Sequence, residues 1–128
     1  MDVIHSAIWV SDIDQTLEFY VGELGLEKTN DFVGGDDARN VYVRGEGEAE
    51  IQFKHNPEHD LGEPGSQRFD HLALEVDDTD ALVERLTEET ESELVRGPLD
   101  STGVSGRIAF VTDPDGYVIE LIEPRDDL

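Results

Sequence analysis

Cysteine is absent from the 128-residue chain, which excludes disulfide bonds, thiolate catalysis and cysteine-ligated zinc. Basic residues are scarce: nine Lys and Arg stand against 32 Asp and Glu, and the formal net charge is −23. Because no basic patch is available to meet phosphates, nucleic-acid binding is not expected. Long apolar runs are also missing, since none approaches the roughly 20 residues of a membrane helix.

The remaining composition is that of a folded, strongly acidic domain. Alternating apolar segments argue against disorder, and the length suits one compact domain with a core of its own. The excess of carboxylates predicts a hydrated, salt-adapted surface of the halophile type, whose self-repulsion salt would screen. The N-terminus runs directly into a strand-like pattern without a signal segment, so we expect a cytoplasmic protein.

A ten-residue segment that opens with a histidine occurs twice without a gap, as HSAIWVSDID at 5–14 and as HLALEVDDTD at 71–80. Each copy is an alternating apolar stretch followed by an acidic helix start. A second pair, IQF at 51–53 and IEL at 119–121, lies downstream. Two halves of about 60 residues would each be marginal alone, so we expect them to share a core or a sheet.

The periodicity predicts a βαβββ order in each half, which is an α+β fold. Strands are expected at 3–10, 26–33, 39–44 and 49–55, and then at 69–76, 93–96, 107–112 and 118–123. One helix starts at Ser11 or Asp12 and stops at Gly25, and the other covers 78–90. The DPDG sequence at 113–116 predicts a hairpin turn. The single domain therefore divides into a first module at 1–55, a linker at 56–68 and a second module at 69–128.

Two histidines and two carboxyl-type side chains occupy matching places in the two halves: His5 with Gln52, and His71 with Glu120. Because strand side chains alternate between faces, all four are predicted to point away from the helix-covered side. Imidazole and carboxylate ligands suit a divalent cation such as Zn, Ni, Co, Mn or Fe, and the amide oxygen of Gln52 would be a weaker, neutral ligand. The pattern predicts a metal site.

Four further side chains near the candidate ligands have a predicted role, or a predicted lack of one, from their strand face or their loop. Trp9 and Lys54 share the ligand-bearing strand faces and are candidates for lining a substrate pocket. His55 and His59 have a helical ligand spacing, but Pro57 lies between them in a polar loop, so no helix aligns them. We therefore expect these two histidines not to be metal ligands.

These segments resemble the vicinal oxygen chelate superfamily (glyoxalase, bleomycin resistance protein and dioxygenase), and within it the short glyoxalase I, or lactoylglutathione lyase, type. The resemblance is carried by the opening histidine strand, LEFY through LGL at 17–26, DHLALEVD at 70–77, IAFV at 108–111 and DPDGYVIELIE at 113–123. It implies two βαβββ modules that cup a metal, usually in a homodimer. It also implies that the ligands are His5, Gln52, His71 and Glu120.

The implied activity converts the hemithioacetal of methylglyoxal and a thiol to an S-lactoyl thioester through an enediolate. Glu120 falls on the position of the proton-transferring base, and Asn56 matches a thiol-contacting asparagine. Short glyoxalases usually carry glutamate where this chain has Gln52, and a glutathione-binding arginine where it has Trp9. An external thiol is required because cysteine is absent, and these departures leave its identity open.

Three alternatives share the same residues. Methylmalonyl-CoA epimerase has the same His-Gln-His-Glu order and a second glutamate base; the corresponding strand at 39–44 has no glutamate here, and Glu75 is a candidate in its place. Extradiol dioxygenases carry the two-histidine, one-carboxylate set that His5, His71 and Glu120 would provide. Drug-binding resistance proteins keep the cupped sheet without the metal, which would make the chain a small-molecule-binding protein.

Overall fold

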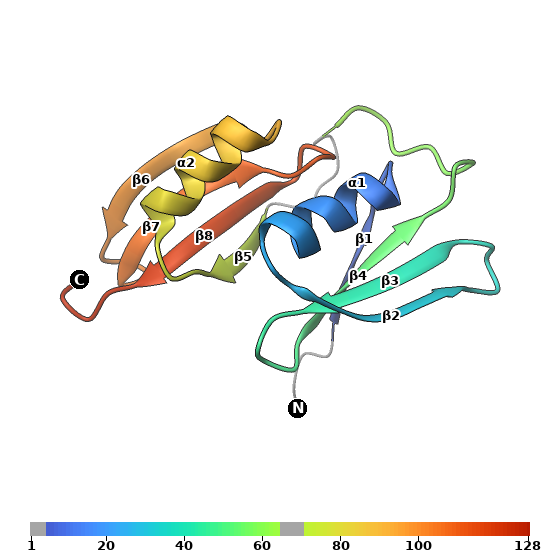
Figure 1. Ribbon diagram of the computed structural model, residues 1–128, viewed down its shortest axis with the longest axis horizontal. Coiled ribbons are helices and arrows are strands. Elements are labelled where there is room, and N and C mark those ends of the chain that lie inside the picture. The colour runs from blue at the N-terminus through green and yellow to red at the C-terminus, as the bar shows by residue number, and fades with distance from the viewer. Residues whose placement is uncertain (1–4, 65–70) are drawn as a thin grey trace. The chain divides into compact units, whose positions relative to one another are not determined.

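The computed structural model describes residues 5–64 and 71–128. The chain falls into two compact units, residues 1–63 and 64–128, and each holds a four-stranded mixed sheet with one helical segment (Figure 1). The α+β class and the repeated βαβββ order predicted from the sequence are confirmed. The first residues of the strands expected at 3–10 and 69–76, and the last part of the expected linker, lie outside the described residues.

The sheet of the first unit has the strand order β1-β4-β3-β2. Its strands are β1 (His5–Trp9), β2 (Glu27–Val33), β3 (Arg39–Arg44) and β4 (Glu50–His55). Strands β1 and β4 are parallel, and the other two pairs are antiparallel. The helix α1 (Ile13–Leu17) continues into a π-helical segment, η1 (Glu18–Glu23).

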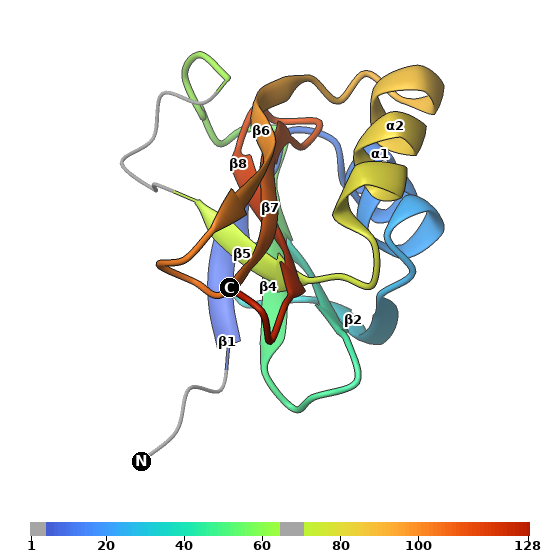
Figure 2. The same ribbon diagram turned by 90° about the vertical axis from the view of Figure 1, so that its left-hand side faces the viewer.

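The α1–η1 segment begins and ends where the sequence predicts. The side chain of Asp12 caps it by accepting a hydrogen bond from the Gln15 N–H at 3.0 Å, and Gly25 follows it with a φ of 78°, a conformation that favours glycine. Its buried Tyr20 packs on Phe53 of β4, with ring centroids 4.7 Å apart. The segment therefore covers one face of the sheet (Figures 1 and 2).

The second unit repeats this arrangement with the strand order β5-β8-β7-β6. Its elements are β5 (Leu72–Glu75), α2 (Thr79–Glu89), β6 (Leu94–Ser101), β7 (Gly106–Thr112) and β8 (Val118–Pro124). Strands β5 and β8 are parallel, as β1 and β4 are in the first unit. The helix α2 packs on β6, β7 and β8 (Figure 2).

The turns and caps of the second unit follow the sequence signals. Asp78 caps α2 by accepting a hydrogen bond from the Ala81 N–H at 3.0 Å. In the predicted DPDG turn, Asp113 Oδ1 accepts hydrogen bonds from the N–H groups of Asp115 and Tyr117, both at 2.9 Å. An aspartate that ties down its own turn in this way is favoured at such positions.

Two elements differ from their predictions. Strand β6 extends to Ser101, whereas the sequence indicates a strand at 93–96, because the pairing with β7 shifts register and accommodates Gly97 and Pro98 in a bulge. The first helix is α-helical only to Leu17 and then widens into η1. Among the described residues, no helix has the length and apolar character required to cross a membrane.

Candidate functional site

The sequence repeat is also a repeat of strand register. Ala7 of β1 lies opposite Gln52 of β4, and Ala73 of β5 lies opposite Glu120 of β8. A histidine precedes each alanine by two positions. Since residues two apart on a strand share a face, each unit places one histidine and one carboxyl-type side chain together on the face opposite its helix. We call this the open face of each sheet.

In the second unit the two candidate ligands meet directly. Nε2 of His71 lies 3.2 Å from Oε1 of Glu120, and Glu120 is buried, with 7% of its surface exposed. A nitrogen and an oxygen that each bind one ion at about 2.1 Å, as adjacent ligands, lie about 3.0–3.4 Å apart. The observed spacing therefore fits two ligands of a single divalent cation, once Nε2 has no proton.

In the first unit the corresponding pair is supported by neighbours from β3. Gln52 Nε2 donates a hydrogen bond to Asn40 Oδ1 at 2.8 Å. The ring of His5 meets Tyr42 edge to face, with centroids 5.5 Å apart, just as His71 meets Phe110 at 5.8 Å in the second unit. Both aromatic residues lie opposite the carboxyl-type side chain of their unit. Each histidine thus has an aromatic ring as a neighbour.

The predicted pocket-lining residues Trp9 and Lys54 lie on the open face of the first unit. The Lys54 ammonium lies 4.9 Å from the centre of the Trp9 ring, a cation–π contact. It also pairs with Asp36 at 2.9 Å, and this hydrogen bond lowers the pKa of the Asp36 carboxyl. His59 stacks on Trp9 with ring centroids 3.9 Å apart. Residue periodicity cannot predict that stack, because His59 lies in an irregular loop.

The loop after β4 uses its polar side chains locally. Asn56 Oδ1 accepts a hydrogen bond from the Glu58 N–H at 3.0 Å, which leaves the Asn56 amide nitrogen as the group that could meet a substrate. Nδ1 of His55 lies 3.2 Å from the Val10 carbonyl oxygen. His55 is therefore engaged with the backbone of the segment after β1.

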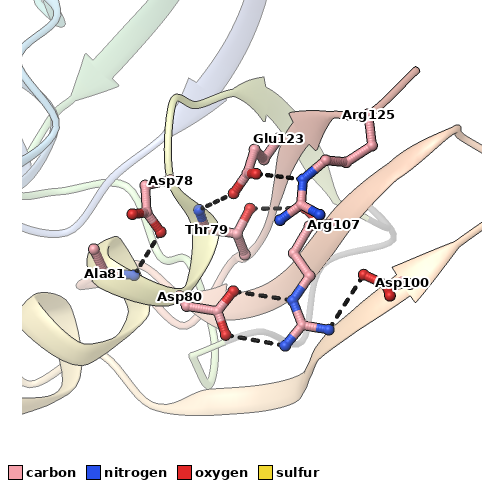
Figure 3. A network of polar contacts seen from close by, with 8 residues as sticks. All are labelled: Asp78, Thr79, Asp80, Ala81, Asp100, Arg107, Glu123 and Arg125. Atoms are coloured by element: carbon pink, nitrogen blue, oxygen red, sulfur yellow. Dashed lines mark hydrogen bonds and ion pairs between the residues drawn. The ribbon is translucent and has the colours of Figure 1, made fainter. Parts of the chain in front are cut away.

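A second acidic group lies at the start of α2, where Asp78, Asp80 and Glu123 bring carboxylate oxygens within 4.8 Å of one another (Figure 3). The positions of these three residues in the sequence do not indicate that they meet. Arg107 holds Asp80 with two hydrogen bonds of 2.9 and 3.0 Å, and Arg125 holds Glu123 at 2.6 Å.

Hydrogen bonding accounts for this acidic group without a metal. The guanidinium partners lower the pKa of both Asp80 and Glu123, and Asp78 is occupied as the helix cap. Glu123 also accepts a hydrogen bond from the Thr79 N–H at 3.0 Å. The group therefore ties the first turn of α2 to β7 and β8, and we assign it a structural role.

The supporting residues Asn40, Tyr42 and Phe110 were missed, although the sequence contained a signal for two of them. Residues equidistant from the centre of a hairpin loop face each other. Centring the first loop on Gly47 places Tyr42 opposite Gln52, and centring the second on Asp115 places Phe110 opposite Glu120. The hydrogen bond between Asn40 and Gln52 joins diagonal neighbours, and strand periodicity does not specify such contacts.

Known proteins are similar to this chain in sequence. A family model described as the glyoxalase/bleomycin resistance protein/dioxygenase superfamily matches residues 3–121. A lactoylglutathione lyase from Haemophilus influenzae is 34% identical, over 98% of this chain and 94% of that protein. A probable lactoylglutathione lyase from Synechocystis is 33% identical, over 96% of this chain and 95% of that protein.

Solved structures are similar to this chain in fold. Glyoxalase I from Zea mays superposes with a TM-score of 0.80 at 28% identity, over 97% of this chain, which spans 45% of the maize chain. TnmS3, an antibiotic binding protein from Streptomyces, superposes with a TM-score of 0.72 at 31% identity, over 97% of this chain and 96% of that one. The same fold thus occurs in a glyoxalase and in an antibiotic-binding protein.

Proposed function

Because the chain belongs to the glyoxalase/bleomycin resistance protein/dioxygenase superfamily, we propose that it is a metal-dependent enzyme of the glyoxalase I type. The proposed reaction converts the hemithioacetal of methylglyoxal and a thiol to an S-lactoyl thioester. Relatives named lactoylglutathione lyase, at 31–34% identity over nearly the whole chain, support this class of enzyme.

The observation that carries the proposal is the register repeat with its His71–Glu120 pair. We propose that His5, Gln52, His71 and Glu120 are ligands of a divalent cation, such as Ni, Co, Zn, Mn or Fe. The 3.2 Å spacing of the second pair is that of adjacent ligands. A buried carboxylate is costly unless it is paired, and a bound cation would be a partner for Glu120 beside His71.

When bound, the cation would polarise the two vicinal oxygens of the substrate and stabilise the charge of an enediolate. Glu120 is the proposed base: its carboxylate removes the proton from the carbon that bears the thiol sulfur and returns it to the neighbouring carbon. No net proton is gained or lost. Gln52 carries no charge and cannot accept the proton, so the matching position in the first half leaves the base role to Glu120.

The open face of the first unit suits part of the thiol. We propose that Trp9, Lys54 and Asn56 contact the substrate. Trp9 and Lys54 offer an aromatic surface and a cation, and Asn56 retains a free amide nitrogen within the described residues. The partners are then a small-molecule substrate and a low-molecular-weight thiol. A cytoplasmic location and a homodimer complete the proposal.

Substitution of the proposed base tests the chemistry. Glu120→Gln keeps the shape of the side chain and removes its basicity, so thioester formation from methylglyoxal plus a thiol should fall by about 10²–10⁴-fold. A panel of thiols, assayed by thioester absorbance, would identify the co-substrate. Glu84→Gln, on the exposed surface of α2, removes the same charge elsewhere and should leave the rate unchanged. Retained turnover in Glu120→Gln would remove this residue as the base.

Metal analysis tests the ligands separately. Protein purified in high salt should contain metal, and His5→Ala and His71→Ala should each lower its content. Unchanged metal content in both variants would refute the ligand assignment.

A second candidate function is the binding of a small molecule without turnover. The 31% identity to an antibiotic binding protein over nearly the full length of both chains favours it. Absence of thioester formation with every thiol, together with stoichiometric binding of an aromatic compound that Trp9→Ala abolishes, would favour this function.

Two other enzyme classes have their own assays. Racemisation of a branched acyl-CoA that Glu75→Gln abolishes would indicate an epimerase. Iron-dependent oxygen uptake with catechols would indicate a dioxygenase.

A further inference from the structure

Asn40 is a buried polar residue, 4% exposed, that lies on β3 and contacts a proposed ligand. We infer that Asn40 is a positioning residue: it fixes the Gln52 amide with its oxygen directed toward the metal and thereby requires a neutral ligand at position 52. The inference rests on the proposed metal site and goes beyond it, because it explains why this half-site has an amide where its counterpart has a carboxylate.

The direction of the hydrogen bonds carries the inference. Asn40 Nδ2 donates to the Ala38 carbonyl oxygen at 2.9 Å, and a carbonyl can only accept. The Asn40 amide is therefore oriented with Oδ1 toward Gln52, so Gln52 must present its Nε2 donor, at 2.8 Å. The Gln52 Oε1 atom is then the end that remains available to a cation.

The surroundings of Asn40 leave little free space beside its amide. Ala38 is fully buried, and Gly34 lies so near that a Cβ placed on it would come within 3.1 Å of Asn40 Nδ2. The chain of hydrogen bonds from Gln52 through Asn40 to Ala38, which we call the relay, thus begins in the turn between β2 and β3.

A carboxylate at position 52 conflicts with this relay. Its oxygen would face Asn40 Oδ1, and two acceptors without a proton repel each other. Turning the Asn40 amide over would satisfy the carboxylate but would set Oδ1 against the Ala38 carbonyl. A buried polar group loses its partner in either arrangement, which is the costly case.

The second unit shows the opposite pairing. Asn40 lies opposite Lys54 on β4, and the position with the same register on β7, opposite Ile122 of β8, is Ile108. Ile108 is buried, and its side chain cannot form hydrogen bonds. The neighbouring candidate ligand in that unit is the carboxylate of Glu120. Asparagine therefore accompanies the amide, and isoleucine accompanies the carboxylate.

A cobalt(II) titration of the metal-free protein, followed by the visible absorption of the bound ion, tests the inference without an activity assay. Gln52→Ala should raise the Kd for Co²⁺ at least 10-fold. Asn40→Ala should raise it about 10-fold, the usual effect of losing a residue that orients a ligand. The double variant should bind no more weakly than Gln52→Ala alone, since Asn40 acts only through Gln52. Circular dichroism of the metal-free variants checks that they fold.

The outcomes separate the inference from the function on which it rests. If Gln52→Ala weakens binding while folded Asn40→Ala does not, the positioning role is wrong and the metal site stands. If neither Gln52→Ala nor His5→Ala changes the Kd, the proposed metal site itself is wrong.

A swap between the units provides a test that does not require Asn40→Ala to fold. Asn40→Ile combined with Gln52→Glu copies the second half into the first. This double variant should bind Co²⁺ about 10-fold more tightly than Gln52→Glu alone, in which Asn40 opposes the carboxylate. Equal or tighter binding by Gln52→Glu alone would overturn the inference.

Discussion

Tyr117 is a single residue whose ionisation the fold opposes. It is 5% exposed, and burial together with the carboxylates of Asp115 and Asp113 raises its pKa from 10.0 to about 12. The shift favours the neutral phenol in the native state, so the resulting stability is present below pH 10 and is lost as the pH rises toward 12. Residues of this kind set the alkaline limit of the protein.

Tyr117→Phe should abolish this alkaline loss. Between pH 9 and pH 12 the free energy of unfolding of the parent protein should fall by about 2 kcal/mol more than that of the variant. Urea unfolding at a series of pH values measures the difference. Parallel pH profiles for the two proteins would show that the native state does not retain the Tyr117 proton.

The residues of the candidate site differ in how well the sequence predicts their surroundings. The repeat in the sequence correctly indicated that His5 and Gln52 share a strand face, as His71 and Glu120 do, because strand alternation is a local property. It could not indicate the Asn40 hydrogen bond, which depends on how a side chain reaches a diagonal neighbour. The strand faces of the candidate ligands could therefore be predicted from the sequence. The hydrogen bond from Gln52 to Asn40 could not.

At the scale of the elements, the hydrophobic periodicity located every strand and both helical segments that the structure describes. Strand bounds agree to within a few residues where alternation is uninterrupted, as at β3 (Arg39–Arg44). They fail at β6, where Gly97 and Pro98 indicate the end of a strand. The pairing of β6 with β7 absorbs both residues in a bulge, and that depends on a distant partner strand.

Gly97 is required by that bulge. Its φ is 85°, and an added Cβ would lie 2.7 Å from the Ile108 carbonyl oxygen. Gly97→Ala should therefore destabilise the fold by about 1–3 kcal/mol from the backbone conformation alone, with a further cost from the contact. Thermal unfolding measures the change.

Gly35 provides the matched control. A Cβ at Gly35 meets no atom within 4 Å, so Gly35→Ala should be neutral or slightly stabilising. Equal melting temperatures for Gly97→Ala and Gly35→Ala would show that the bulge has no need of glycine.

At the scale of the whole molecule, the net charge of −23 is expected to weaken the folded state through self-repulsion. Like charges on a compact body repel, and the repulsion is relieved when the protein expands or when salt screens it. The net charge already counts all nine Lys and Arg, so ion pairs such as that of Arg107 with Asp80 do not reduce it. The acidic composition therefore predicts a protein whose folded state depends on salt.

Raising KCl from 0.05 M to 2 M should increase the midpoint of urea unfolding. Screening depends on ionic strength, so NaCl and KCl at equal ionic strength should act alike, whereas sulfate should add its own effect through exclusion from the surface. An unfolding midpoint that is independent of KCl concentration would argue against salt adaptation.

The matching registers of β1–β4 and β5–β8 have a stereochemical consequence. If both halves carried a carboxylate at the matching position, two bases could deliver a proton. Here one half has an amide and the other a carboxylate at the corresponding position. A proton that leaves to a single base returns from that base, to one face of the carbon skeleton. The loss of symmetry between Gln52 and Glu120 would thus give one enantiomer of any product with a new stereocentre.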